Sequence, residues 1–184
     1  MTVQGIELPK GSLLIGDGRV ERTTAGVFEQ IDPSTGEVLA PVTLAGATEI
    51  DDAVRAANAS ETEWRALAPT RRRDLILALA DKLDEHHEEL SILRSLELGA
   101  PKKQGKGLNM AVEYIRYFAG WVDKLEGTTI PISSTVLDYT IPEPYGTVAA
   151  LTPWNGGVVS VAMKVVPALV AGNCVVLKPS ELAT

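Results

Sequence analysis

The sequence predicts an α/β chain, on three patterns that follow one another along it. Short hairpin patterns open the chain, amphipathic helical patterns fill its middle, and a strand–helix–strand pattern closes it. Apolar strands on both sides of an apolar helix are typical of a parallel βαβ unit that is buried on both faces. A chain of 184 residues with 45% hydrophobic residues is long enough to bury a core around such a unit.

Turn residues divide the first quarter of the chain into two expected hairpins. Residues 13–20 place apolar runs around the turn Gly16–Gly18, and residues 27–44 place them around the segment DPSTG at 32–36. Proline presets φ for such a turn and glycine accepts positive φ. Gly16 and Gly18 lack the third glycine and the following helix of a dinucleotide-binding loop, so we interpret them as turn residues.

Apolar residues spaced by three and four predict helices from residue 48 to residue 125. Thr48 is expected to cap the first of them. A second pattern runs from Pro69 to Gly99, where Gly99 and Pro101 stop it, and a third spans about 107–125. The stripes that predict a buried face are Ile50, Val54 and Ala57; Leu75, Ile76, Leu79 and Leu83; and Ala111, Tyr114, Phe118, Trp121 and Leu125.

Extended structure is expected after the helices. Residues 128–144 are rich in β-branched residues and contain three prolines, which confine a strand to an edge or a crossover. Apolar strands at 146–151 and 174–177 then flank an apolar helix at 158–171. The two strands are expected to lie parallel, because a helix connects them.

Charge and cysteine content narrow the function classes. Lys and Arg number 17 against 24 Asp and Glu, a net charge of −7, so we expect neither a nucleic-acid nor a membrane-surface partner. The single cysteine, Cys174, excludes an intramolecular disulfide and favours the cytoplasm. Lys164 and Pro167 interrupt the longest apolar stretch, at 158–177, which argues against a membrane span.

Polar residues follow both expected parallel strands. Ligands of parallel α/β sheets bind beyond the carboxyl ends of the strands, so the two loops that begin there are the candidate site. Purely structural roles remain open for these residues. Asn155 would cap the next helix, Lys164 would extend from that helix into solvent, and Lys178 with Glu181 would form a surface ion pair. The residues in these loops are Thr152, Pro153, Trp154 and Asn155, then Lys178, Pro179, Ser180 and Glu181.

Four motifs give the chain a family resemblance. The segments TPWNGG, VPALVAGN and CVVLKPSE, with DPSTGEV near the N-terminus, resemble the NAD(P)-dependent aldehyde dehydrogenase superfamily. The resemblance implies an incomplete fold of that family, in which N-terminal hairpins and helices lead into the first βαβ unit of a Rossmann-like NAD domain. It also implies three parts: 1–127 in the cofactor-binding domain, 128–145 as bridging strands for oligomerisation, and 146–184 as the truncated βαβ unit.

The resemblance assigns roles to the loop residues. Asn155 resembles the amide that donates to the substrate oxyanion, and Lys164 resembles a lysine near the active site. Lys178 and Glu181 resemble the residues that contact the adenosine ribose. Because a carboxylate would repel a 2′-phosphate, we expect NAD as the cofactor, with NADP as the alternative. Thr152, Pro153, Trp154 and Ser180 are expected to line the cofactor cleft.

The family oxidises an aldehyde to a carboxylic acid through a cysteine thioester, and its nucleophile and general base lie far downstream of the KPSE motif. This chain stops at Thr184, and Cys174 begins a buried strand. We therefore expect the chain to be inactive alone and the complete protein to be a homo-oligomer, a dimer or a tetramer. The alternative is a non-catalytic nucleotide-binding or assembly module that pairs with full-length subunits.

Overall fold

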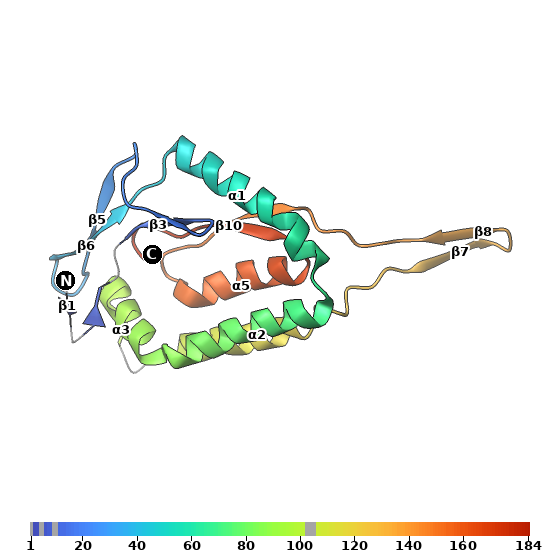
Figure 1. The fold of residues 1–184 in the computed structure, drawn as a ribbon. Helices are drawn as coiled ribbons and strands as arrows, with labels where there is room; N and C mark the ends of the chain where they lie inside the picture. Colours follow the sequence, from blue (N-terminus) through green and yellow to red (C-terminus); the bar gives the residue numbers. More distant parts are fainter. Residues whose placement is uncertain (1, 4–5, 9–10, 102–105) are drawn as a thin grey trace.

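A parallel pair of strands stands between two helical layers. The computed structural model describes residues 2–3, 6–8, 11–101 and 106–184. Strands β9 (Thr147–Leu151) and β10 (Cys174–Lys178) pair in parallel, as the sequence predicts, and α5 (Gly157–Val170) connects them. Helix α1 (Ala47–Ala66) packs on this pair from the other side, as Figure 1 shows.

The main core lies between three helices. Helices α2 (Pro69–Glu85) and α4 (Lys106–Ala119) lie side by side, and α5 packs between them and the sheet (Figure 1). Their facing side chains are small or branched, so the helices approach closely and leave little room between them. The buried residues of this core are Ile76, Ala80, Ala111, Val112, Ile115, Ala119, Val122, Ala162, Val166 and Val170.

Antiparallel hairpins form the N-terminal part, as expected. The first predicted hairpin is β3 (Leu13–Ile15) with β4 (Gly18–Val20), and Gly16 has a φ of 56° at its turn. The second is β5 (Val27–Ile31) with β6 (Val38–Thr43). The short antiparallel pair of β1 (Thr2–Val3) and β2 (Ile6–Glu7) is not predicted from the sequence.

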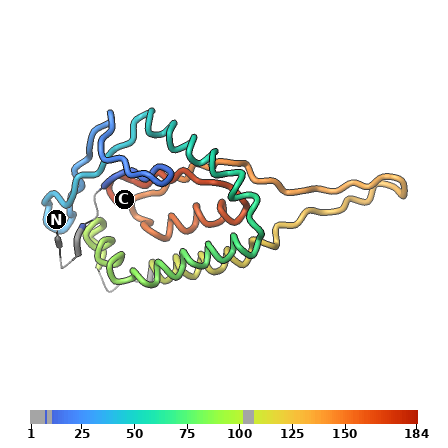
Figure 2. Tube along the Cα trace, in the orientation of Figure 1, coloured from blue at the N-terminus to red at the C-terminus, as the bar shows by residue number. Residues whose placement is uncertain are grey.

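The expected extended segment forms a hairpin arm. Strands β7 (Thr129–Ser133) and β8 (Val136–Tyr139) pair antiparallel and project away from the helices, as the trace in Figure 2 shows. Every residue of β7 is exposed. Thr128 and Thr140 close its base, because the N–H of Thr140 donates to the carbonyl of Thr128 at 2.9 Å. We call β7 and β8 with this base the arm.

The single helical pattern predicted from Pro69 to Gly99 is wrong in one respect, because two helices occupy it. Helix α2 ends at Glu85, and α3 (His87–Leu98) starts in a new direction. The backbone of His86 leaves the helical region, with φ −98° and ψ 17°. The bend carries α3 to the second hairpin, where Leu39, Ile92 and Leu96 are buried with Leu8. Gly99 ends α3 in the left-handed conformation, as predicted.

The predicted helix over 107–125 ends early, at Ala119. The N–H of Gly120 bonds to the carbonyl of Tyr117, three residues back, which tightens the chain into a turn. Trp121 and Leu125 therefore leave the stripe and are 40% and 48% exposed, so the expected aromatic core face is wrong at its end.

The first helix differs from expectation at its cap and its buried face. Gly46, not Thr48, is the N-cap, and its N–H donates to the Glu49 carboxylate at 2.7 Å. Ile50 and Val54 are 52% and 37% exposed, so the predicted stripe is wrong at these two positions, whereas its third residue, Ala57, is half-buried. Three alanines are among the half-buried residues of α1, and their small side chains let the helix lie close to the strands; they are Ala53, Ala56 and Ala57.

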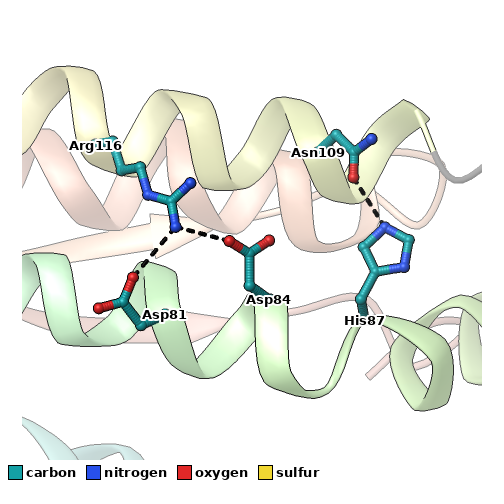
Figure 3. A network of polar contacts seen from close by, with 5 residues as sticks. All are labelled: Asp81, Asp84, His87, Asn109 and Arg116. Atoms are coloured by element: carbon teal, nitrogen blue, oxygen red, sulfur yellow. Dashed lines mark hydrogen bonds and ion pairs between the residues drawn. The ribbon is translucent and has the colours of Figure 1, made fainter.

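Polar contacts join α2 and the start of α3 to α4 on the outer surface. Arg116 donates to Asp81 at 3.2 Å and to Asp84 at 2.7 Å, so one guanidinium bridges two turns of α2 (Figure 3). His87 lies 2.9 Å from the amide oxygen of Asn109. These contacts are solvent-exposed, so each is expected to contribute little to the free energy of unfolding.

One buried amide fixes the start of both parallel strands. Asn173 is 4% exposed; its side-chain oxygen accepts the N–H of Gly146 at 3.1 Å and its amide donates to the carbonyl of Ala168 at 3.0 Å. The N–H of Cys174 donates in turn to the carbonyl of Gly146 at 2.9 Å. The end of α5 and the first residues of β9 and β10 are thus held together.

The described residues leave out 1, 4–5, 9–10 and 102–105. Among their helices, none combines the length and the apolar character that a membrane-spanning segment needs. No three of the described His, Cys, Asp and Glu residues gather as metal ligands would.

Replacing Asn173 by alanine tests the buried amide. We expect Asn173→Ala to lower the free energy of unfolding by about 1–3 kcal/mol, because it leaves the buried N–H of Gly146 without its acceptor. Urea unfolding followed by circular dichroism measures this. Asn109→Ala is the matched control at an exposed amide, where a change within about 0.5 kcal/mol is expected. Equal losses in both variants would contradict this account of Asn173.

Candidate functional site

Both candidate loops leave the same edge of the sheet. Leu151 at the end of β9 pairs with Lys178 at the end of β10, so the two parallel strands finish level. The N–H of Thr152 donates to the carbonyl of Lys178 at 3.1 Å and extends the pairing by one residue. The carboxyl ends of the two strands therefore present residues 152–156 and 179–184 side by side. We call this the carboxyl edge.

The first loop exposes most of its predicted site residues. Thr152 is 9% exposed, whereas Trp154 is 52% exposed and Pro153 and Asn155 are also exposed. Gly156 is the N-cap of helix α5, and no side chain caps this helix. Asn155 therefore does not make the capping hydrogen bond that its structural alternative requires. Asn155 is thus an exposed residue without a capping role.

Two glycines shape the end of this loop. Gly157 has a φ of 47°, a conformation that side chains rarely adopt. A Cβ on Gly156 would lie 1.7 Å from the hydroxyl oxygen of Ser160. The backbone between Asn155 and α5 thus turns in a space that a larger residue would not fit.

The second loop pairs its two charged residues. The ammonium of Lys178 donates to Glu181 Oε2 at 3.3 Å. Hydrogen bonds from the residue's own backbone and from Lys178 hold the pKa of the Glu181 carboxyl below its usual value. Ser180 accepts the N–H of Leu182 on its hydroxyl at 3.2 Å, and its backbone bridges to Ala183. Glu181 is thus an ionised acceptor on a turn with internal hydrogen bonds.

Lys164 and Cys174 lie elsewhere. Lys164 is exposed in the middle of α5, about 10 Å along the helix from its first residue at a rise of 1.5 Å per residue. Cys174 is at the opposite end of β10 from Lys178, is 8% exposed, and has its pKa raised by burial. Burial of this thiol agrees with its expected role as a small apolar residue.

Sequence reasoning missed two residues behind the second loop. Gln30 on β5 donates to the carbonyl of Leu182 at 3.0 Å and to Glu97 Oε1 at 3.2 Å. Glu97, at the end of α3, also accepts the N–H of Thr184 at 3.1 Å. These residues are far apart in the sequence and belong to no motif, so no local signal identifies them.

A cleft of about 480 Å³ lies away from the carboxyl edge, between the base of the arm and the end of α5. Arg65, Arg72, Pro144 and Gly172 are among the residues that line it. The Nε atom of Arg72 is enclosed and has no hydrogen-bond partner in the described structure. None of the predicted site residues lines this cleft, so it is separate from the candidate site.

Comparisons with known proteins agree on one family. The sequence model of the aldehyde dehydrogenase family matches residues 20–184. Aldehyde dehydrogenase 1 of Tanacetum cinerariifolium is 38% identical over 173 residues, which cover 92% of this chain and 35% of the relative.

Solved structures of this fold give the same result. An NAD⁺ complex of aldehyde dehydrogenase from Bacillus cereus is 37% identical and matches with a TM-score of 0.88, covering 92% of this chain and 35% of that one. An NADP-dependent enzyme of E. coli is 31% identical and matches with a TM-score of 0.90, covering 95% of this chain and 37% of that one.

The chain spans about a third of the length of the curated relatives that it matches. It matches solved structures over a similar share of their length, as an N-terminal portion of the fold would. The family model nevertheless covers almost all of this chain, from Val20 to its last residue. The chain belongs to the aldehyde dehydrogenase family.

Proposed function

We propose that this chain is the part of an NAD-dependent aldehyde dehydrogenase that binds the adenosine half of the cofactor and supplies one oxyanion donor. The complete protein would oxidise an aldehyde to a carboxylic acid through a cysteine thioester. One observation carries the proposal: β9 and β10 end level, so Asn155 and the Lys178–Glu181 pair leave the same edge. This edge is where parallel sheets bind nucleotides.

The donors and acceptors at the carboxyl edge fit a dinucleotide. Glu181 is ionised and half-buried, and a carboxylate accepts the two hydroxyl protons of a ribose. Lys178 is exposed beside it and donates. Bound NAD would supply the hydride acceptor. In this proposal Thr152, Pro153, Trp154 and Ser180 line the cleft, and the exposed indole of Trp154 gives it an apolar wall.

The charge of Glu181 favours NAD over NADP. The lowered pKa keeps this carboxylate negative at neutral pH, and a negative group repels the 2′-phosphate of NADP. Lys178 offsets part of that repulsion, because its ammonium lies 3.3 Å from the carboxylate. We therefore propose NAD as the preferred cofactor and NADP as the weaker one.

Asn155 is proposed as the oxyanion donor. Its amide is exposed and makes no cap on α5, so it is free to donate to an aldehyde oxygen as negative charge develops there. Lys164 is proposed to act near the substrate, from the exposed side of α5. No nucleophile is assigned, because the thiol of Cys174 is buried at the far end of β10.

The arm is proposed as a subunit contact of the complete homo-oligomer. All five residues of β7 are exposed, and both strands present an unpaired edge. Such edges pair with further strands. Residues 128–145 would then be the bridging part, between a cofactor-binding part at 1–127 and the βαβ unit at 146–184.

Substituting Glu181 tests the ribose contact. In the complete protein that contains this chain, Glu181→Gln is expected to raise the Kd for NAD about tenfold or more, because hydrogen bonds to a charged group are lost. The preference for NAD over NADP is expected to fall as well. Isothermal titration with both cofactors measures this. Glu126→Gln is the control. Equal affinities for NAD in the parent protein, Glu181→Gln and Glu126→Gln would refute the contact between Glu181 and the ribose.

Substituting Asn155 separates an oxyanion donor from a structural residue. Asn155→Ala is expected to lower kcat by about 100-fold to 1000-fold with little change in the Kd for NAD, as for the loss of one oxyanion donor. Aldehyde-dependent NADH formation by the complete protein measures kcat. A lowered melting temperature with an unchanged kcat would instead refute the oxyanion role and give Asn155 a structural one.

A further inference from the structure

We propose that Gln30 and Glu97 position the turn that carries Lys178 and Glu181, and so set the affinity for the cofactor without touching it. This inference rests on the proposed cofactor site. We call the two side chains the strut. Gln30 comes from β5 and Glu97 from the end of α3. The second hairpin and α3 thus together hold a turn of the βαβ unit.

Gln30 is placed as a structural amide, not as a surface residue. It is 4% exposed, among the most buried polar side chains in the described chain. Its Nε2 atom has both of its protons engaged, one on the carbonyl of Leu182 at 3.0 Å and one on Glu97 Oε1 at 3.2 Å. A buried amide that satisfies two acceptors on other segments fixes the distance between them.

Glu97 completes the strut from the other side. Its Oε1 atom accepts the N–H of Thr184 at 3.1 Å in addition to the amide of Gln30. Burial raises the pKa of this carboxyl, and the two hydrogen bonds oppose that rise. Taking a carboxylate out of water is unfavourable unless donors replace the water, so the site depends on both donors remaining in place.

The strut holds the turn immediately after Glu181. Gln30 bonds to Leu182, the next residue, and Glu97 bonds to Thr184. Hydrogen bonds within the turn involve only neighbouring residues, from Ser180 to Leu182 and Ala183. The Lys178–Glu181 pair joins the turn to the end of β10, but both of its side chains are exposed. The strut adds part-buried hydrogen bonds from β5 and α3, and so helps to fix where the Glu181 carboxylate lies.

An apolar cluster keeps the strut itself in place. Leu39 of β6 is buried with Ile92 and Leu96 of α3, so the second hairpin and the end of α3 are packed together. Leu96 immediately precedes Glu97, and Gln30 pairs with Ala40, the neighbour of Leu39. Gln30 and Glu97 are thus held in place by the packing of neighbouring apolar residues, in addition to the hydrogen bond between them.

Two variants that preserve volume test the strut in the complete protein. Gln30→Met removes both donors, and Glu97→Gln removes the charge. Each variant is expected to raise the Kd for NAD roughly threefold to tenfold, because a displaced Glu181 carboxylate loses part of its hydrogen bonding to the ribose. Each is also expected to speed amide hydrogen exchange at Leu182 and Thr184, while kcat at saturating NAD stays within about twofold of the parent.

The controls separate this inference from the proposed function. Glu89→Gln, on the same helix at an exposed position, is expected to change neither the Kd nor the exchange. The double variant Glu97→Gln with Glu181→Gln is expected to bind NAD no more weakly than Glu181→Gln alone. Fully additive losses would overturn the inference, as would an unchanged Kd in both strut variants. An unchanged Kd in Glu181→Gln alone would instead overturn the proposed cofactor contact.

Discussion

The buried amide of Asn173 accepts the N–H of Gly146 and donates to the carbonyl of Ala168, so one side chain joins the start of β9 to the end of α5. Because β9 and β10 begin at this point, Thr147 pairs with Cys174 and the register is set for all five residue pairs. A slip of one residue would turn every side chain of a strand to the other face. The level ends at the carboxyl edge are thus a consequence of contacts made at the opposite end of the strands.

Much of the fold follows from patterns that are local in the sequence. The turns at Gly16 and Gly99, the parallel strands and the connecting helix were predictable because each depends on residues within a few positions of one another. The errors arise where tertiary contacts decide. His86 breaks a continuous apolar pattern so that α3 reaches the second hairpin. In α1, Ala53, Ala56 and Ala57 are half-buried although Ile50 and Val54 are more apolar.

The candidate site divides in the same way. Asn155, Lys178 and Glu181 could be proposed from the sequence because they belong to contiguous motifs at strand ends. Gln30 and Glu97 were missed because their partners, Leu182 and Thr184, are distant along the chain. A buried amide and a glutamate at the end of a helix are unremarkable in the sequence, and only the fold brings them behind the turn. Contacts that support a site are harder to predict than the residues that form it.

The arm has a further consequence for assembly. Its strands are exposed and its base is closed by Thr128 and Thr140, so it buries little apolar surface against the helices. A two-stranded ribbon of this kind is only marginally stable by itself. Its fluctuations are therefore separate from the cooperative unfolding of the helical core. If the complete protein assembles through the arm as proposed, ordering the arm against a neighbouring chain would cost conformational entropy, and that cost would reduce the net free energy of association.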